Sequence, residues 1–518
     1  MTVGSFRNQS VWREIRYATI LLLIFCCWSG ARCEVRLPQI LSSHMVLQRN
    51  QPIHVWGWAT PHESVSVAMH GASRGAVADD LGKWSVYLPP QPAGGPYQLT
   101  IAGSNTIVLD DVLIGDVWFA SGQSNMEMPL KGWAGSPLKD AAEEVAHSNQ
   151  PRLRLLIVSQ KTSEYPLRDI SGSCMPCNPE TAADFSALAY FFGRDLAARE
   201  NVPIGLIESA WGGTVAEAWT SLDALSSDAS LMPLFAARAH MMDKQSDVEL
   251  RTAIELHEDE VAKKAGLPPP THEWRPDAAS WQPAALYNGM VAPVTEFGIK
   301  GVIWYQGESN AVPGFESVYA QLFPKLIADW RSHWREGNFP FLFVQIASFR
   351  STNPWASIRE AQRRSLAEVN TAMAVTIDIS DPGQIHPANK QDVGTRLALA
   401  ARALAYGEPV EYSGPLFRQA APDEHGLRMW FDHAQGLNAH GADPEGFEIA
   451  GDDRHFVKAI AHVDGDTVVA SSPEVQAPEY VRYGWASVPE ANLYNSAGLP
   501  ASPFTSEPAI PISEGESQ

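Results

Sequence analysis

Ser124 stands where a serine nucleophile would be placed, in the sequence GQSNM directly after the apolar run 117–120. A serine on a tight turn at the end of a strand presents its hydroxyl, and a glycine in that turn lets the backbone approach a substrate closely. When a base removes its proton, such a hydroxyl attacks the carbonyl carbon of an ester. The same sequence also fits a serine that only caps the following helix, so this segment alone leaves both interpretations open.

The matching base is predicted at His386, in the sequence DPGQIHPANK between the apolar run 374–379 and a helical segment. A general base has to lie within hydrogen-bond reach of the nucleophile's hydroxyl. The chain has 15 histidines, and a histidine chosen at random is more often a surface or capping residue. The position of His386 after a predicted strand is what favours it over the others.

Two further loops carry groups that could stabilise negative charge. The sequence WGGT at 211–214 follows the apolar run 204–209, and QGESN at 306–310 follows the run 301–305. Acyl transfer develops charge on the carbonyl oxygen, and glycine backbone amides or amide side chains can donate hydrogen bonds to it. Either loop alone could be an ordinary tight turn, but four such loops together indicate acyl-transfer chemistry.

The elements that must position these loops alternate along the chain. Apolar runs typical of buried strands cover 117–120, 153–158, 204–209, 301–305, 341–347 and 374–379. Between them, helical periodicity aligns Leu188, Phe191, Phe192 and Leu196, and later Val393, Leu397, Ala400, Ala401 and Leu404, with Gly407 as a helix stop. This alternation predicts an α/β fold with a parallel sheet covered on both faces, whose reactive groups gather beyond the carboxyl ends of the strands.

The remaining sequence predicts several domains, since 518 residues exceed one ordinary domain. Short strand patterns over 34–108 predict an antiparallel β-sandwich, and similar patterns over 411–505 predict a C-terminal β domain. The α/β domain then covers 109–410, with a polar helical insertion at 226–283 that is a candidate lid. The tail 506–518, rich in Pro, Ser and Glu, is predicted to be disordered.

Residues 1–33 have the pattern of a Sec signal peptide. Arg13 and Arg16 precede the apolar run 18–28, and Ala31 and Cys33 stand at the minus-three and minus-one positions of a cleavage site. The run is shorter than the roughly 20 apolar residues of a membrane span. The sequence therefore predicts a secreted or periplasmic protein with no membrane contact after cleavage; an uncleaved N-terminal anchor is the alternative.

Composition and charge narrow the partners. A hydrophobic content of 45% with 19% charged residues is typical of soluble globular proteins. The formal net charge of -21 disfavours nucleic acid as a partner, because neutralising phosphates requires a basic surface. An anionic substrate would then need a local basic pocket, without long-range steering.

After signal cleavage the chain keeps two cysteines, Cys174 and Cys177, in the sequence SGSCMPCNP. A redox pair would be expected at a helix N-terminus beside a βαβ unit, which this Ser-, Gly- and Pro-rich context does not resemble. A zinc site would need further ligands, and no second CxxC or HxxxH exists in the sequence. The sequence favours either a small structural disulfide or two free thiols.

Long segments of the chain resemble the sialate O-acetylesterase family of the SGNH hydrolases. They are GDVWFASGQSNMEMP, ESAWGGTVAEAW, LYNGMVAPV, GVIWYQGESNA and IHPANKQDVGTRLA, with MVLQRNQPIHVWGWA near the N-terminus and YVRYGWASVPEANLYNSAGLPASPF near the C-terminus. The resemblance implies an SGNH-type α/β/α sandwich of flavodoxin-like type, flanked by N- and C-terminal β domains. It also implies an O-acetylated sugar as substrate, sialic acid first, and no metal or organic cofactor.

The resemblance also implies roles for individual residues. Ser124 would be the nucleophile, His386 the base, and Gly213 with an amide of the QGESN loop the oxyanion partners, in a mechanism that passes through an acetyl-enzyme. The full set of predicted oxyanion and substrate-binding residues is Gly213, Gln306, Asn310, Gln123, Asn125, Trp211 and Glu308.

The catalytic acid departs from the family pattern. Many SGNH enzymes have an aspartate three residues before the histidine, where this chain has Gly383, and members of this family commonly have Asp just before Ile-His-Pro, where this chain has Gln384. Asp381 is the predicted acid, because it shares the loop with His386 and the Pro-Gly that follows could fold the chain back. The other acids considered are Asp378 and Glu308. A backbone carbonyl that orients His386 would instead leave a Ser/His dyad.

Two other functions remain open at this point. An acetylxylan esterase or another carbohydrate acetylesterase would share the fold and the Ser/His pair, because specificity lies in pocket loops. A non-catalytic carbohydrate-binding protein would not require Ser124, His386 and Gly213 together. The carboxylate of sialic acid would favour an arginine in the pocket, with Arg350 and Arg359 as candidates that could equally be surface residues. The sequence predicts neither the acetyl position nor the oligomeric state.

Overall fold

The computed structural model describes residues 34–510 except 273, 274, 276 and 425. The predicted signal peptide at 1–33 and the last part of the predicted tail, 511–518, lie outside the described residues. The start of that tail is ordered, because the carboxylate of Glu507 is buried and accepts hydrogen bonds from the guanidinium of Arg482.

The chain divides into two compact units. Among the described residues, the smaller unit comprises 34–37, 55–88 and 98–108, and the larger unit comprises 38–54, 89–97 and the chain from 109 to 510. The strands that run through the smaller unit are β2 (Ile53–Trp58), β3 (Ser64–Met69), β4 (Ala72–Val77), β5 (Lys83–Leu88) and β6 (Gly94–Ala102). β3 pairs antiparallel with β4 and β6, and β2 pairs with β5. Buried and exposed residues alternate along β3, as expected for a sheet with one face on a core.

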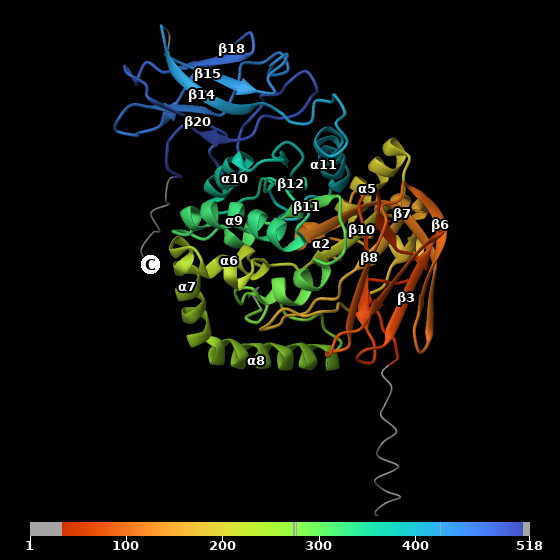
Figure 1. Cartoon of the computed structure of the whole chain (residues 1–518). Helices are drawn as coiled ribbons and strands as arrows, with labels where there is room; N and C mark the ends of the chain where they lie inside the picture. The colour runs from red at the N-terminus through yellow and green to blue at the C-terminus, as the bar shows by residue number, and fades with distance from the viewer. Residues whose placement is uncertain (1–33, 273–274, 276, 425, 511–518) are drawn as a thin grey trace, which may run out of the picture. The chain divides into compact units, whose positions relative to one another are not determined.

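A mostly parallel sheet forms the centre of the larger unit (Figure 1). Its strands are β1 (Val46–Gln48), β7 (Thr106–Gly122), β8 (Gln150–Ile157), β9 (Met175–Cys177), β10 (Ile204–Ala210), β11 (Gly301–Tyr305), β12 (Phe341–Val344) and β13 (Thr371–Ala374). The order β13-β12-β11-β7-β10-β8 is parallel throughout, and β9 adds an antiparallel edge. This confirms the predicted parallel sheet. The five strands β10-β7-β11-β12-β13 have the flavodoxin-type order 2-1-3-4-5, and β8 is an additional strand on the outer side of β10.

Helices cover both faces of this sheet. Trp118 of β7 packs edge-on against Phe192 of α5 (Ala187–Glu200), with ring centroids 5.0 Å apart. The next residue, Phe119, packs against Trp330 and Trp334 of α9 (Glu316–Trp334). Because successive side chains of a strand point to opposite faces, α5 and α9 lie on opposite sides of the sheet, which confirms the α/β/α sandwich.

The remaining helices follow from the same periodicity. α11 (Lys390–Leu404) packs against α5, and its buried residues include the predicted Val393, Leu397, Ala400 and Ala401. α10 (Trp355–Arg364) packs against α9. The other α-helices described before residue 230 are α2 (Ser124–Glu127), α3 (Ala141–Ala146), α4 (Pro179–Ala182) and α6 (Leu222–Ser226).

Two predicted strands end earlier than their apolar runs. The runs 341–347 and 374–379 were expected to be strands throughout, but β12 ends at Val344 and β13 ends at Ala374. Beyond those points, the hydroxyl of Thr376 donates to the carbonyl of Gln345, and Arg396 donates to the carbonyl of Val375. Side-chain donors thus replace strand pairing, so apolar character alone predicts the carboxyl ends of these two strands wrongly.

The predicted insertion 226–283 contains α7 (Met232–Asp243) and α8 (Gln245–Lys264). Each of them buries one residue, Leu234 in α7 and Ala262 in α8. In Figure 1, α8 runs along the border of the larger unit rather than within its layers. Within the described part of the chain, no helix has both the length and the apolar character to span a membrane.

Two four-stranded antiparallel sheets form the C-terminal β region. Their orders are β14-β15-β19-β18 and β17-β16-β20-β21. The strands are β14 (Leu416–Asp423), β15 (Gly426–Asp432), β16 (Phe447–Ala450), β17 (Val457–Lys458), β18 (Ile460–Asp464), β19 (Thr467–Ser471), β20 (Tyr480–Tyr483) and β21 (Phe504–Thr505). One buried cluster contains Met429 and Val468 from the first sheet and Ile449 and Val481 from the second, so the two sheets share a core.

Cys174 and Cys177 are free thiols in this structure. Burial raises the pKa of each thiol to about 12, which keeps both in the unreactive protonated form at neutral pH. Of the two interpretations that the sequence left open, the structure therefore has the free thiols rather than the disulfide.

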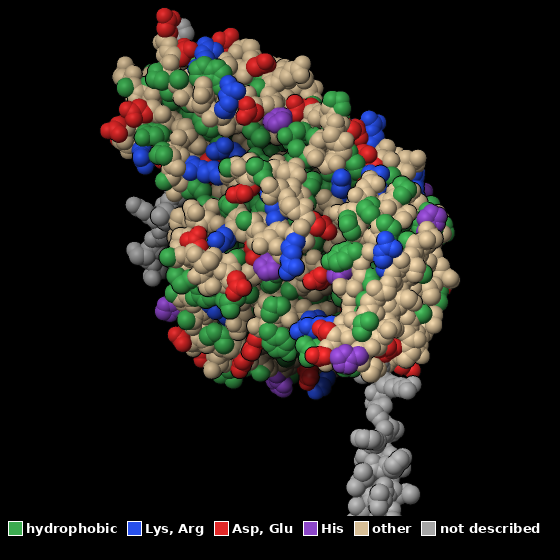
Figure 2. All heavy atoms as spheres, in the orientation of Figure 1, with side chains coloured by type: hydrophobic (Ala, Val, Ile, Leu, Met, Phe, Trp, Pro, Cys, Tyr) green, Lys and Arg blue, Asp and Glu red, His purple; other side chains and the backbone are tan. Residues whose placement is uncertain are grey.

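Acidic and basic groups are interspersed among the described side chains on the face of the molecule in Figure 2. The net negative charge of the chain is thus not gathered into one acidic region on this face. Local charge, rather than a broad field, must govern which anions approach the site described below.

Candidate active site

The loops that follow β7, β10 and β11 meet at one edge of the sheet because these three strands are neighbours. Gly122 ends β7 with a φ of +143°, and a Cβ at this position would lie 2.1 Å from the carbonyl oxygen of Tyr305 in β11. Only glycine permits this approach. The backbone N–H of Gln123 then donates to the same carbonyl at 2.9 Å. These constraints place half-buried Ser124 at the start of α2, just beyond the sheet.

The structure brings Ser124 and His386 together. Nε2 of His386 lies 2.9 Å from Oγ of Ser124, although 262 positions separate them in the chain. The indole of Trp133 packs edge-on against the imidazole, with ring centroids 5.2 Å apart. The 2.9 Å between Nε2 and Oγ is within the range at which a general base takes the proton of a hydroxyl nucleophile.

His386 is neutral at physiological pH in this environment. Burial, together with a smaller contribution from the neighbouring ammonium of Lys390, lowers the pKa of the imidazole to about 4. A neutral imidazole can accept a proton through Nε2, whereas a protonated one cannot. The site is therefore set up for base catalysis over a pH range that extends well into the acid.

Asn125 connects the loops around this pair. Its Nδ2 donates to Oε1 of Glu308 at 2.6 Å and to the carbonyl of Ile385 at 3.0 Å. Its Oδ1 accepts a hydrogen bond of 2.5 Å from Nζ of Lys390. Since Ile385 precedes His386, the side chain of Asn125 connects the turn that carries Ser124 with the QGESN loop at 306–310 and with the loop that carries His386, the histidine loop.

Lys390 and Glu308 form a buried pair of opposite charge on either side of Asn125. Burial lowers the pKa of Lys390 to about 7, and Glu308 opposes that shift. Burial likewise raises the pKa of Glu308, whose second oxygen, Oε2, is buried without a hydrogen-bond partner among the described residues. Neither residue contacts Ser124, so both are placed to position and tune His386 rather than to react.

The turn at 211–214 lies beside Ser124, since a Cβ on Gly212 would lie 3.2 Å from the Cβ of Ser124. Gly213 adopts a φ of +71°, and its carbonyl accepts a hydrogen bond of 2.6 Å from Nε1 of Trp281. Glu127 at the end of α2 accepts from the N–H of Gly212 at 2.5 Å, which joins the nucleophile helix to this turn. The N–H groups of Gly213 and Ser124 donate to no other described residue. Both are therefore available to an oxyanion.

The predicted amide side chains mostly hold the loops together. Nε2 of Gln306 donates to Oδ1 of Asn310 at 2.6 Å and to the carbonyl of Thr214 at 3.2 Å. Nδ2 of Asn310 donates to Oε2 of Glu217 at 2.9 Å, which leaves one of its two N–H bonds for a ligand. Oε1 of Gln123 accepts from the N–H groups of residues 307 and 309.

Trp211 takes part in the same set of contacts through its backbone. Its N–H donates to the carbonyl of Gly122 at 3.1 Å, and its carbonyl accepts from the hydroxyl of Thr214 at 2.7 Å.

Within the described ranges, no group of three or more His, Cys, Asp or Glu side chains is arranged to hold a metal ion. The chemistry that this arrangement supports is acyl transfer by a serine with a neutral histidine as base.

Comparison with curated proteins identifies relatives along almost the whole chain. The sialate O-acetylesterases of Rattus norvegicus and Homo sapiens are each 30% identical to it, over 94% of this chain and 97% and 95% of their own lengths. The chain belongs to the sialate O-acetylesterase family. A family model described as a carbohydrate esterase, sialic acid-specific acetylesterase, matches residues 270–403, which include His386 and the QGESN loop.

A solved structure agrees with this assignment. A carbohydrate acetylesterase from Xanthomonas citri superimposes with a TM-score of 0.79 at 38% identity, over 92% of this chain and 100% of that one. This member of the sialate O-acetylesterase family is accordingly a carboxylic ester hydrolase of the carbohydrate esterase type.

The predicted acid does not contact the histidine in this family member. Asp381 is exposed, and its Oδ1 accepts a hydrogen bond of 2.9 Å from the N–H of Gly383 in its own turn. Asp378 forms a two-pronged pair with Arg396, with both distances 2.7 Å. Among the described residues, no carboxylate lies within ion-pair distance of either ring nitrogen of His386. The assignment of Asp381 stays a prediction.

One of the two arginines predicted for a substrate carboxylate is wrongly placed for it. The guanidinium of Arg359 is completely buried and donates to the backbone carbonyls of Ile346, Ala347, Ala486 and Ser487. Arg359 therefore connects α10 with the C-terminal β region. Because its N–H donors already bind backbone carbonyls, they cannot bind a substrate carboxylate. Arg350 is exposed, and its backbone N–H donates to the carbonyl of Pro382 beside the histidine loop.

Several residues of the site had no predicted role. Glu127, Glu217 and Lys390 stand within the segments that resemble the family, so their positions were visible in the sequence. Their roles were not, because each depends on a partner from a different loop. Trp281 lies in the insertion, outside any motif, and no sequence signal connects it with Gly213.

Removing the charge of Lys390 should shift the pH dependence of this esterase. Burial is the larger cause of the lowered pKa of His386, and the ammonium of Lys390 adds to it, so Lys390→Met should raise the pKa of the imidazole above about 4 while burial still holds it below the ordinary value. Protonated His386 cannot act as base, and the acid limb of kcat/KM, which reports the free enzyme, should move to higher pH by the same amount. The measurement is kcat/KM against pH for acetate release.

Lys139→Met is the matched control for this experiment. Lys139 is exposed and its backbone N–H donates to the carbonyl of Ala388 in the histidine loop, yet its side chain is not part of the Asn125 contacts. Its replacement should leave the acid limb where it is. An unmoved limb in Lys390→Met as well would show that Lys390 does not tune His386.

Proposed function

We propose that this protein hydrolyses O-acetyl esters on sialic acid through an acetyl-enzyme formed on Ser124. The observation that carries the mechanism is the 2.9 Å contact between Ser124 Oγ and His386 Nε2. The substrate is taken from the relatives, because the curated proteins that match along the whole chain are sialate O-acetylesterases and the matching family model is described as sialic acid-specific.

The proposed reaction has two halves. His386 takes the proton of Ser124 as Oγ attacks the acetyl carbonyl, and the N–H groups of Gly213 and Ser124 donate to the oxyanion. The resulting imidazolium gives its proton to the departing sugar oxygen, which leaves an acetyl ester on Ser124. A water molecule then attacks this ester with His386 again as base, releasing acetate and restoring the hydroxyl.

We further propose that His386 works without a carboxylate on its ring. What supports this is the set of contacts that fixes the histidine loop, namely the edge of Trp133 on the imidazole and Asn125 on the carbonyl of Ile385. Removing the aspartate of a Ser-His-Asp triad costs about ten-thousandfold in kcat. The dyad and the triad with Asp381 therefore predict very different results for one substitution.

Asp381→Asn is expected to lower kcat by less than about tenfold, since a carboxylate that does not touch the imidazole contributes little to its orientation. Steady-state acetate release at neutral pH measures this. Asp378→Asn is not a suitable control, because it would break the pair with Arg396. A loss of several orders of magnitude in Asp381→Asn would instead establish the triad.

Two further proposals concern the N-terminus of the chain and the limits of its domains. We propose that residues 1–33 direct export, giving a secreted or periplasmic protein that begins at Glu34, which N-terminal sequencing of the purified protein would test. We also propose 34–108, 109–410 and 411–505 as the domain limits, with the flanking β domains outside the chemistry.

A neutral polysaccharide is the second candidate substrate. The similar protein from Xanthomonas citri, at 38% identity, is a carbohydrate acetylesterase, a class that includes enzymes acting on other acetylated carbohydrates. Acetate release from O-acetylated sialic acid and from acetylated xylan, each with wild type and Ser124→Ala, separates the candidates. We expect the larger kcat/KM on the sialic acid substrate. A larger kcat/KM on acetylated xylan would mean that a neutral polysaccharide is the substrate. If neither substrate gave Ser124-dependent acetate release, the function would be carbohydrate binding without catalysis.

A further inference from the structure

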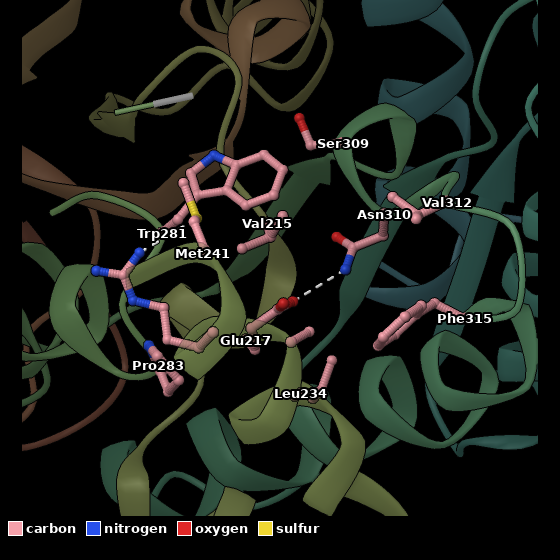
Figure 3. A pocket seen from close by; sticks show the side chains of 12 residues that line it. Val215, Glu217, Leu234, Met241, Trp281, Pro283, Ser309, Asn310, Val312 and Phe315 are labelled. Carbon is pink, nitrogen blue, oxygen red and sulfur yellow. Dashed lines mark hydrogen bonds between the residues drawn. The ribbon is translucent and has the colours of Figure 1, made fainter. Parts of the chain in front are cut away.

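A cavity of about 290 Å³ lies beside the turn that carries Gly213. Its walls come from α7 of the insertion, from residues 215–217, from Trp281 and Pro283, and from the loop after β11 (Figure 3). Pockets for small molecules begin at roughly this size, about 300 Å³. The cavity is therefore large enough for one sugar ring.

Direct contacts connect this cavity with the catalytic loops. Trp281 lines it and donates to the carbonyl of Gly213 at 2.6 Å. Ser309 also lines it, and the N–H of Ser309 donates to Gln123, the residue before the nucleophile. These two contacts place the cavity next to the turns that carry Gly213 and Ser124.

Arg238 of α7 brings a cation to this cavity that has no ion-pair partner among the described residues. It is one of the lining residues, and its Nε is buried without a hydrogen-bond partner in the described part of the chain. One terminal nitrogen lies 3.2 Å from Sδ of Met241, a weak acceptor. Burial lowers the pKa of Arg238, and the charge of Asp277, which lies beyond ion-pair distance, opposes this shift. The guanidinium nevertheless stays charged at neutral pH. The side chain as a whole is half-buried, but a buried N–H donor without an acceptor among the described residues is costly, and an oxygen of a ligand would compensate it.

The other lining groups suit a hydroxylated ligand. Glu217 faces the cavity and accepts from Asn310 through Oε2 only, so its other oxygen can accept from a hydroxyl (Figure 3). The rings of Trp281 and Phe315 supply apolar walls of the kind that pack on sugar C–H groups. A cation, an acceptor and aromatic surface together describe a site for a sugar acid.

We infer that Arg238 binds the carboxylate of sialic acid while the O-acetyl group of the same molecule lies at Ser124. A guanidinium can present Nε and one terminal nitrogen as a parallel pair of donors to a carboxylate. This inference rests on the proposed function and adds to it, because it makes α7 the source of substrate specificity. It also assigns to Arg238, in the insertion, the binding of the substrate carboxylate that was expected of Arg350 or Arg359.

The test compares two substrates that differ only in charge, O-acetylated sialic acid and its carboxylate methyl ester. For Arg238→Met, the ratio of kcat/KM for the acid to kcat/KM for the ester should fall by about 10- to 100-fold, the effect of losing a hydrogen bond to a charged group. Arg238→Lys should recover part of the ratio, since it restores the charge without the paired donors. Arg251→Met, an exposed arginine of α8, should keep the wild-type ratio.

A second measurement separates this inference from the proposed function. Free sialic acid should inhibit hydrolysis of a small acetate ester more strongly than its methyl ester does, and this difference should disappear in Arg238→Met. If wild type shows that difference but releases no acetate from O-acetylated sialic acid, the proposed function fails while Arg238 keeps its role. If both the substrate ratio and the inhibition are the same in Arg238→Met and wild type, Arg238 does not bind the carboxylate.

Discussion

Ser124→Ala should lower kcat for acetate release by at least about a thousandfold, because no other group can form the acetyl-enzyme. The substitution removes one oxygen from a half-buried side chain, and that oxygen's described side-chain contact is with His386. The fold should therefore be unchanged, with the same thermal unfolding midpoint within error. Steady-state kinetics on O-acetylated sialic acid, with the variant purified away from wild type, gives the measurement.

The control for this result lies in the adjacent residue. Asn125→Ala keeps the nucleophile but removes the bonds to Glu308, Lys390 and the carbonyl of Ile385. It should lower both stability and activity, whereas Ser124→Ala should lower activity alone. Substantial turnover by a folded Ser124→Ala enzyme would mean that another group attacks the acetyl carbonyl.

His386→Gln is expected to cause a loss of similar size, about a thousandfold or more in kcat, since the hydroxyl of Ser124 is a poor nucleophile without a base. Glutamine can occupy part of the space of the imidazole but cannot accept the proton. The two residues act as one unit, so Ser124→Ala combined with His386→Gln should cost little more than either change alone.

The double variant makes this second prediction sharp. Non-additivity is expected only if both side chains serve the same step. Losses that multiply in the double variant would show that Ser124 and His386 contribute independently, and that the 2.9 Å contact between them is not the catalytic one.

Much of the fold, and the closeness of Ser124 and His386, could be predicted from the sequence for physical reasons. Apolar runs between amphipathic helices specify a covered parallel sheet, and the carboxyl ends of such strands gather their loops at one edge. Ser124 and His386 could be found because each follows an apolar run. Trp118 and Phe119 show how far the pattern reaches, since adjacent residues of one strand bury against helices on opposite faces.

Features that depend on partners distant in the sequence could not be predicted. Lys390 looks like an ordinary first residue of a helix, and only the fold buries it against Asn125 and beside Glu308. Arg359 seemed suited to a substrate carboxylate, but backbone carbonyls of the C-terminal β region occupy its donors. Arg238 carried no signal, because the insertion has no motif and the cavity exists only where α7 faces the loop after β11.

Labelling with a serine-directed fluorophosphonate, followed by peptide mass spectrometry, tests the central claim most directly. We predict a single adduct on Ser124, loss of acetate release from O-acetylated sialic acid in proportion to labelling, and protection by that substrate. His386→Gln should label far more slowly, since the base activates the hydroxyl for this reaction too. Full acetate release from enzyme labelled at Ser124, or inactivation with the adduct on another residue, would contradict Ser124 as the nucleophile.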